Sequence, residues 1–132
     1  MKIHHIGYCV NNIDKSILEF EKIGYERFDS KFNDIDRKIY IQFMKNGNML
    51  VELVSPTNEG ESSIDGILKK IGDTAYHICY EVEDINDEIE KLKQEKYILI
   101  NQPQGAIAIN SYEVAFLYKR NVGLIELVEI KK

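Results

Sequence analysis

The sequence predicts an α+β fold made of two βαβββ modules, and two internal repeats lead to this expectation. Residues 5–25 correspond to residues 77–97 at an offset of 72 residues, which aligns the histidine that opens each segment. Residues 51–54 correspond to residues 125–128 at an offset of 74 residues, which aligns two glutamates. Each half therefore starts with a histidine-bearing strand and ends with a glutamate-bearing strand. Two matches in the same order indicate a duplication.

The first module is expected to hold a strand, a helix and three more strands. β-branched and aromatic residues in 5–10 predict the first strand. Asn12 can cap a helix with one apolar face, and Gly24 is suited to end it. That face consists of Ile13, Ile17 and Phe20. The later strands are predicted around residues 25–28, 38–44 and 49–54, with a hairpin turn at Lys45-Asn46-Gly47-Asn48 because Asn-Gly tolerates positive φ.

The second module repeats this pattern. Asp84 is the expected cap of a helix whose apolar stripe is Ile85, Ile89 and Leu92. Further strands are predicted around residues 98–100, 112–118 and 123–129. A short amphipathic segment at about 62–71 predicts a linker helix. We therefore expect one domain over 1–132, built from repeats at about 1–56 and 74–132.

Composition narrows the classes of function. Hydrophobic residues make up 44% of the chain and charged residues 30%, a balance typical of globular proteins. A formal charge of −5, from 17 basic and 22 acidic residues, argues against a nucleic-acid surface. No apolar run approaches the roughly 20 residues that cross a bilayer. The first residues run directly into a strand pattern, so no signal peptide is expected, and two cysteines suggest no disulfide framework. We expect a cytoplasmic protein that binds a small molecule.

Four residues in equivalent places of the two repeats are candidates for a metal site: His5, Glu52, His77 and Glu126. Two imidazoles and two carboxylates suit Ni²⁺, Co²⁺, Zn²⁺, Mn²⁺ or Fe²⁺. Glu52 and Glu126 each lie between apolar residues on a predicted strand, where an inward carboxylate is costly unless it is compensated. A pseudo-two-fold arrangement of the modules would bring the four side chains to one axis.

A plainer interpretation exists for each of these side chains. A strand with one face in water exposes a glutamate without any chemistry. A shifted register would make His4, which has no counterpart in the second repeat, the ligand in place of His5. Cys9 and Cys79 are expected on the same strand faces as the two histidines, as small buried packing residues.

The chain resembles the vicinal oxygen chelate superfamily, which includes glyoxalase I, methylmalonyl-CoA epimerase, extradiol dioxygenases and antibiotic-resistance proteins. The stretches that carry the resemblance are residues 4–20, 51–68, 76–92 and 114–129. The chain is most similar to small clostridial-type glyoxalase I sequences and to methylmalonyl-CoA epimerases. The resemblance implies a curved mixed sheet, formed by paired βαβββ modules, around a metal-binding cup lined by His5, Glu52, His77 and Glu126.

The first activity that the resemblance implies is that of glyoxalase I. Such a lyase converts the hemithioacetal of methylglyoxal and glutathione to S-lactoylglutathione through an enediolate held by the metal. Glu126 would move the proton, with Glu52 as its counterpart on the other substrate face. The implied cofactor is Ni²⁺, Co²⁺ or Zn²⁺, with glutathione as co-substrate, and a homodimer is expected. Arg37 and Arg120 are candidates for binding the glutathione carboxylates, although surface charge explains them equally well.

Two alternatives stay open. One is an acyl-CoA epimerase of the methylmalonyl-CoA type, which shares the proton-removal step. Against it, residues 39–43 carry no acid where a known epimerase pattern has a second glutamate, and residues 116–120 depart from the epimerase pattern FLHPK. The other alternative is a drug-binding protein without catalysis, which the presence of all four candidate ligands disfavours.

Overall fold

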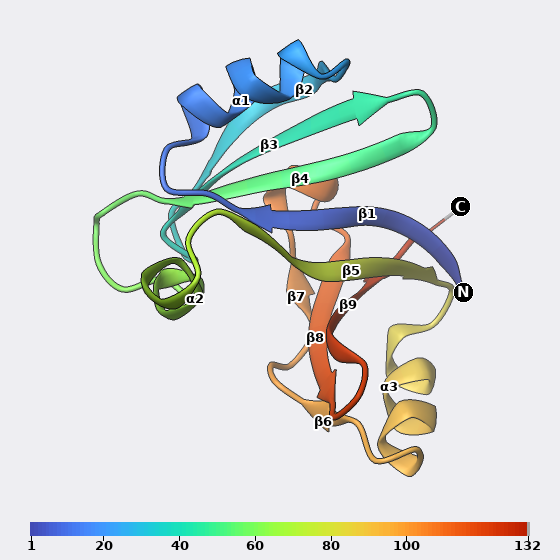
Figure 1. Ribbon diagram of the computed structural model, residues 1–132. Coiled ribbons are helices and arrows are strands. Elements are labelled where there is room, and N and C mark those ends of the chain that lie inside the picture. The colour runs from blue at the N-terminus through green and yellow to red at the C-terminus, as the bar shows by residue number, and fades with distance from the viewer. Residues whose placement is uncertain (132) are drawn as a thin grey trace. The chain divides into compact units, whose positions relative to one another are not determined.

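The computed structural model describes residues 1–131, which contain nine strands and three α-helices (Figure 1). The α+β class expected from the sequence is therefore confirmed. Along this part of the chain, no helix has the length and apolar character required to cross a lipid bilayer. In chain order the elements are β1 (Lys2–Cys9), α1 (Ile13–Lys22), β2 (Glu26–Asp34), β3 (Ile39–Asn46), β4 (Met49–Pro56), α2 (Asp65–Lys70), β5 (Thr74–Val82), α3 (Ile85–Gln94), β6 (Ile98–Leu99), β7 (Gln104–Gly105), a 3-10 turn η1 (Ile107–Ile109), β8 (Glu113–Lys119) and β9 (Gly123–Glu129).

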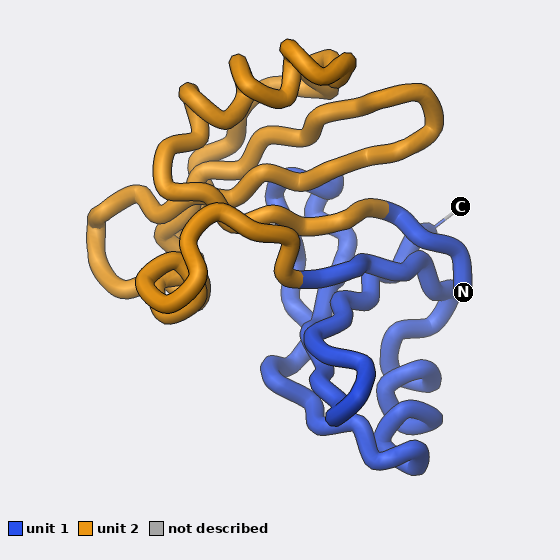
Figure 2. Tube along the Cα trace, in the orientation of Figure 1, with its two compact units in different colours: residues 1–4, 77–132 blue, residues 5–76 orange. Residues whose placement is uncertain are grey.

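The chain divides into two compact units, which Figure 2 colours separately. We call His5–Tyr76 the N-terminal unit, and Met1–His4 together with His77–Lys132 the C-terminal unit. The boundaries fall inside β1 and β5, immediately before His5 and His77. Each unit is described below by itself.

The N-terminal unit has strands in the order β2-β3-β4-β1. β1 and β4 are parallel, whereas β2–β3 and β3–β4 are antiparallel, so its sheet is mixed. α1 packs on one face because its apolar stripe, including Ile13 and Ile17, is buried there. The core between helix and sheet consists of Val10, Ile13, Ile17, Met44, Val51 and Leu53. The other face of this sheet carries the candidate ligands.

The C-terminal unit repeats this plan with strands in the order β5-β9-β8-β6, and with β7 also paired to β8. β5 and β9 are parallel and the other pairs are antiparallel. α3 covers one face through Ile85 and Ile89. The core beneath it consists of Val82, Ile85, Ile89, Ala115, Leu117, Ile125 and Leu127. In both units the helix fixes which strand positions point into the core.

The two long helices start at the predicted caps. The side chain of Asn12 accepts a hydrogen bond from the Lys15 backbone N–H at 3.1 Å. The side chain of Asp84 accepts one from the Asp87 N–H at 3.0 Å. Both caps have nearly the same extended backbone, with φ of −138° and −133°. The repeat therefore extends to the hydrogen bond that begins each helix.

Replacing Asp84 by Ala is expected to lower the free energy of unfolding by about 1 kcal/mol, because one N–H of the first helical turn loses its acceptor. Urea denaturation followed by circular dichroism measures the change. The matched control is Asn86→Ala, at an exposed position of the same helix. An equal loss in both variants would contradict a capping role for Asp84.

Three predictions about local structure were incomplete. The strand expected around residues 25–28 continues to Asp34, interrupted by a bulge between Phe28 and Phe32. Its exposed charged residues conceal the two-residue alternation that identifies a strand. β7 and η1 were not predicted at all, because two-residue and three-residue elements have no periodicity of their own.

Candidate metal centre

The N-terminal unit brings one predicted histidine and one predicted glutamate together. His5 on β1 and Glu52 on β4 lie on neighbouring parallel strands, with Gly7 as the register partner of Glu52. His5 Nε2 lies 3.5 Å from Glu52 Oε1. Both residues are buried, at 0% and 7% exposed. Because buried carboxylates need compensation, this pair is a built feature of the sheet rather than a solvated one.

The C-terminal unit holds the equivalent pair. His77 on β5 and Glu126 on β9 are again on neighbouring parallel strands, and Cys79 occupies the register position that Gly7 has in the other unit. His77 Nε2 lies 3.1 Å from Glu126 Oε1. Both residues are buried, at 4% exposed each.

The local sequence explains why these glutamates face away from the helices. Val51 and Leu53, on either side of Glu52, pack into the core under α1. Ile125 and Leu127, on either side of Glu126, pack into the core under α3. Since side chains alternate along a strand, burying the apolar neighbours turns each carboxylate to the opposite face. The orientation predicted from the apolar flanks is confirmed.

Each pair also includes a phenylalanine that sequence reasoning missed. Phe43 is the register partner of Glu52, and Phe116 is the register partner of Glu126. The Phe43 ring meets the His5 ring edge-to-face at 5.2 Å and 80°, and the Phe116 ring meets the His77 ring at 5.1 Å and 88°. The signal was present, because the repeat offset runs from 72 for the histidines to 74 for the glutamates, and Phe43 and Phe116 are 73 apart.

The donor atoms in each pair fit a divalent cation. Metal–nitrogen and metal–oxygen bonds of about 2.0–2.2 Å place two adjacent ligand atoms roughly 3.0–3.5 Å apart. The observed separations are 3.5 Å for His5 with Glu52 and 3.1 Å for His77 with Glu126. One imidazole nitrogen and one carboxylate oxygen per unit form a mixed donor set for Ni²⁺, Co²⁺ or Zn²⁺. Each pair is therefore suited to contribute two ligands.

The remaining candidates lie apart from these pairs. His4 is half-buried and, as the neighbour of His5 on β1, points to the opposite face, so the shifted register does not occur. Arg37 is held by Asp34, with Nη1 2.7 Å from Oδ2, beside the start of β3. Arg120 is exposed in the turn between β8 and β9.

Cys9 is a buried thiol in the N-terminal unit, on the same strand face as His5. Its Sγ donates a hydrogen bond to the Thr74 carbonyl at 3.6 Å. Burial, which disfavours the thiolate, raises the pKa of Cys9 above its usual value, and the Thr74 contact offsets this only in part. A protonated, enclosed thiol is a packing group rather than a nucleophile.

We expect Cys9 to resist alkylation by iodoacetamide at pH 9, as measured by mass spectrometry of its peptide, and to react at once in urea. The raised folded pKa also sets the sign of its effect on stability. Its contribution is complete below the unfolded pKa of about 8.5 and declines as the pH rises from there towards the folded pKa. Cys9→Ala should therefore show a shallower loss of stability above pH 8.5. Rapid labelling of the folded protein would contradict this account.

Comparison with known proteins identifies the family. Residues 4–116 match the model of the Glyoxalase/Bleomycin resistance protein/Dioxygenase superfamily. The ethylmalonyl-CoA/methylmalonyl-CoA epimerase of Cereibacter sphaeroides is 25% identical over 132 residues, covering 98% of both chains. The mitochondrial methylmalonyl-CoA epimerase of Dictyostelium discoideum is 26% identical, covering 97% of this chain and 78% of its own.

Solved structures share the fold. The methylmalonyl-CoA epimerase of Mycobacterium tuberculosis has a TM-score of 0.85 at 20% identity, covering 99% of this chain and 89% of its own. A hypothetical protein from Bacillus halodurans has a TM-score of 0.84 at 29% identity, covering 99% and 95%. With the family model matched from His4 to Phe116, the chain belongs to the Glyoxalase/Bleomycin resistance protein/Dioxygenase superfamily.

Proposed function

We propose that the protein is a metal-dependent epimerase of malonyl-type acyl-CoA thioesters. In this proposal His5, Glu52, His77 and Glu126 hold one divalent cation, and both repeats act as one domain. The substrate carries an acidic hydrogen on the carbon between the thioester carbonyl and a carboxylate. Epimerisation removes that proton and returns one to the opposite face.

Two observations support this proposal, and the first carries it. Each unit presents a buried imidazole nitrogen and a buried carboxylate oxygen 3.1–3.5 Å apart, which is the spacing of neighbouring ligands on one cation. The curated relatives that match nearly the whole chain are epimerases of ethylmalonyl-CoA or methylmalonyl-CoA. These relatives favour the epimerase alternative, and none of the relatives described above supports the glyoxalase I activity or the glutathione co-substrate expected first.

The chain's own residues would divide the reaction between the two units. A divalent cation supplies Lewis-acid stabilisation of the negative charge that develops on the thioester oxygen. The Glu126 carboxylate accepts the α-proton, and Glu52 delivers a proton to the opposite face, so the substrate leaves with its configuration inverted. Phe43 and Phe116 lie beside these carboxylates and limit the access of water.

Deuterium exchange tests the proposal directly. We expect the protein loaded with Co²⁺, Ni²⁺ or Zn²⁺ to exchange the α-hydrogen of methylmalonyl-CoA in D₂O and to interconvert its epimers, as followed by proton NMR. Glu59→Gln, an exposed loop position, is the control and should behave as wild type. The same preparations should form no thioester from methylglyoxal and glutathione. Thioester formation without α-exchange would overturn the epimerase proposal and restore glyoxalase I.

A further inference from the structure

A row of side chains crosses the sheet of the N-terminal unit on the face that carries Glu52. Register pairs place Phe28 opposite Phe43, and Phe43 opposite Glu52, on the adjacent strands β2, β3 and β4. Neighbouring strands are about 4.8 Å apart, so Phe28 lies about 10 Å from Glu52 across the sheet. Burial decreases outwards, since Phe43 is 4% exposed and Phe28 is 45% exposed. The row therefore ends in an aromatic ring that is open to solvent.

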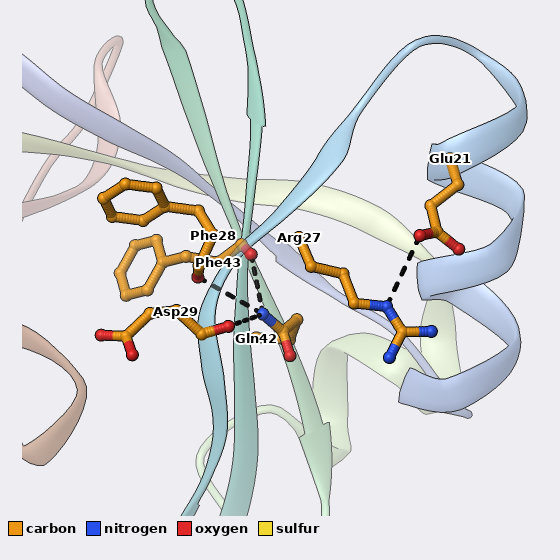
Figure 3. A network of polar contacts seen from close by, with 6 residues as sticks. All are labelled: Glu21, Arg27, Phe28, Asp29, Gln42 and Phe43. Carbon is orange, nitrogen blue, oxygen red and sulfur yellow. Dashed lines mark hydrogen bonds and ion pairs between the residues drawn. The ribbon is translucent and has the colours of Figure 1, made fainter.

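The backbone at Phe28 is held from the other face of the sheet. Directly after Phe28 the strand bulges, and Asp29 has a φ of 68°. Gln42, at 2% exposed, places Nε2 3.0 Å from the Asp29 carbonyl, 2.9 Å from the Phe43 carbonyl and 3.4 Å from the Phe28 carbonyl. Figure 3 shows this amide between the three carbonyls, with both phenylalanine rings on the same side of the strands.

The side chain before Phe28 strengthens this arrangement. Arg27 points to the opposite side, towards α1, where its Nε lies 3.5 Å from Glu21 Oε2 (Figure 3). A bulge near a functional site commonly serves to aim a side chain. Here the buried amide and the ion pair fix the strand on which the exposed Phe28 ring is presented.

A lysine completes the surface. Lys45 lies two residues after Phe43 on β3 and therefore on the same face. It is exposed, and its Nζ lies 5.4 Å from the centroid of the Phe28 ring. An exposed aromatic face beside an ammonium group suits a ligand that is partly apolar and carries negative charge.

We propose that Phe28 and Lys45 form a subsite for the thiol-derived arm of a coenzyme A thioester. The inference rests on the proposed function, because it places this arm on the row that leads outwards from Glu52. The apolar part of the arm packs on the Phe28 ring, and Lys45 pairs with a phosphate of the coenzyme. Gln42 is a positioning residue that holds the bulge.

Binding of free coenzyme A tests the subsite without turnover. Isothermal titration should show that Lys45→Gln and Phe28→Leu each weaken coenzyme A binding by about threefold to tenfold, with a weaker salt dependence for Lys45→Gln. Both positions are solvent-exposed, and circular dichroism verifies that the variants fold. The matched control is Lys31→Gln, since Lys31 Nζ also lies over an aromatic ring, 5.2 Å from the Tyr40 centroid, but on the face towards α1.

The outcomes separate this inference from the proposed function. If α-exchange fails with every metal but coenzyme A binding still depends on Lys45 and Phe28, the subsite stands and the epimerase proposal falls. If α-exchange occurs but both variants bind coenzyme A as wild type does, the subsite is overturned. Binding of S-methylglutathione that depends on Lys45, without binding of coenzyme A, also overturns it by identifying another anionic thiol.

Discussion

Replacing Glu126 by Gln is expected to slow exchange of the substrate's α-hydrogen by roughly 10²- to 10⁴-fold, the contribution of a positioned general base. The amide has the size of the carboxylate and keeps its place between Ile125 and Leu127, but it does not accept the proton. Glu126 is only 4% exposed, so bulk water does not readily replace it. Deuterium incorporation into methylmalonyl-CoA, followed by NMR, measures the rate.

The control for this prediction separates proton transfer from metal loss. Glu113→Gln changes an exposed carboxylate on the neighbouring strand β8 and should leave the rate unchanged. Metal content is determined for Glu126→Gln in the same samples, because removing a ligand also weakens metal binding. A variant that retains the metal and exchanges within tenfold of the wild-type rate would show that another group removes the proton.

One divalent cation per chain is the expected stoichiometry, and either His5→Asn or His77→Asn should abolish it. Four shared ligands make each histidine essential to the same ion. The loss in affinity should exceed the 10- to 100-fold typical of outer-shell changes. Elemental analysis gives the stoichiometry. Thermal denaturation provides a second readout, since saturating metal at about 100 times Kd adds roughly 2.7 kcal/mol of stability that the variants should lack.

The stoichiometry also tests whether the two His–Glu pairs act together. His4→Asn is the matched control, because His4 adjoins His5 but points to the opposite face of β1. Two ions in the wild-type chain, with one remaining in each single variant, would mean that each unit binds its own ion. That result would contradict the shared centre.

The sequence predicted the elements that have a regular period. α1, α3 and β9 follow the expected patterns because apolar residues mark one face of each. Gly24 and Gly47 adopt positive φ values of 104° and 60°, as their predicted helix-end and turn positions require. The length of β2 could not be predicted, since a bulge and a mostly exposed surface remove the alternation on which the prediction depends.

The candidate site was predictable to the level of the two pairs. His5 with Glu52, and His77 with Glu126, stand out because a histidine and a carboxylate recur at repeat-equivalent positions. Phe43 and Phe116 did not stand out, because an aromatic residue in a strand is ordinary and only the register places it beside a carboxylate. Gln42 was equally hidden, since its role depends on three backbone carbonyls brought together by folding.

The outermost strand of the N-terminal unit limits how copies of the chain can associate. β2 presents charges of both signs along its length, including Glu26, Arg27 and Lys31, and its bulge interrupts the row of free backbone groups. Such features prevent an approaching strand from continuing the ladder of hydrogen bonds. A homodimer that forms by joining two sheets through β2 is therefore disfavoured, and the same charges protect the chain from fibrous assembly at high concentration.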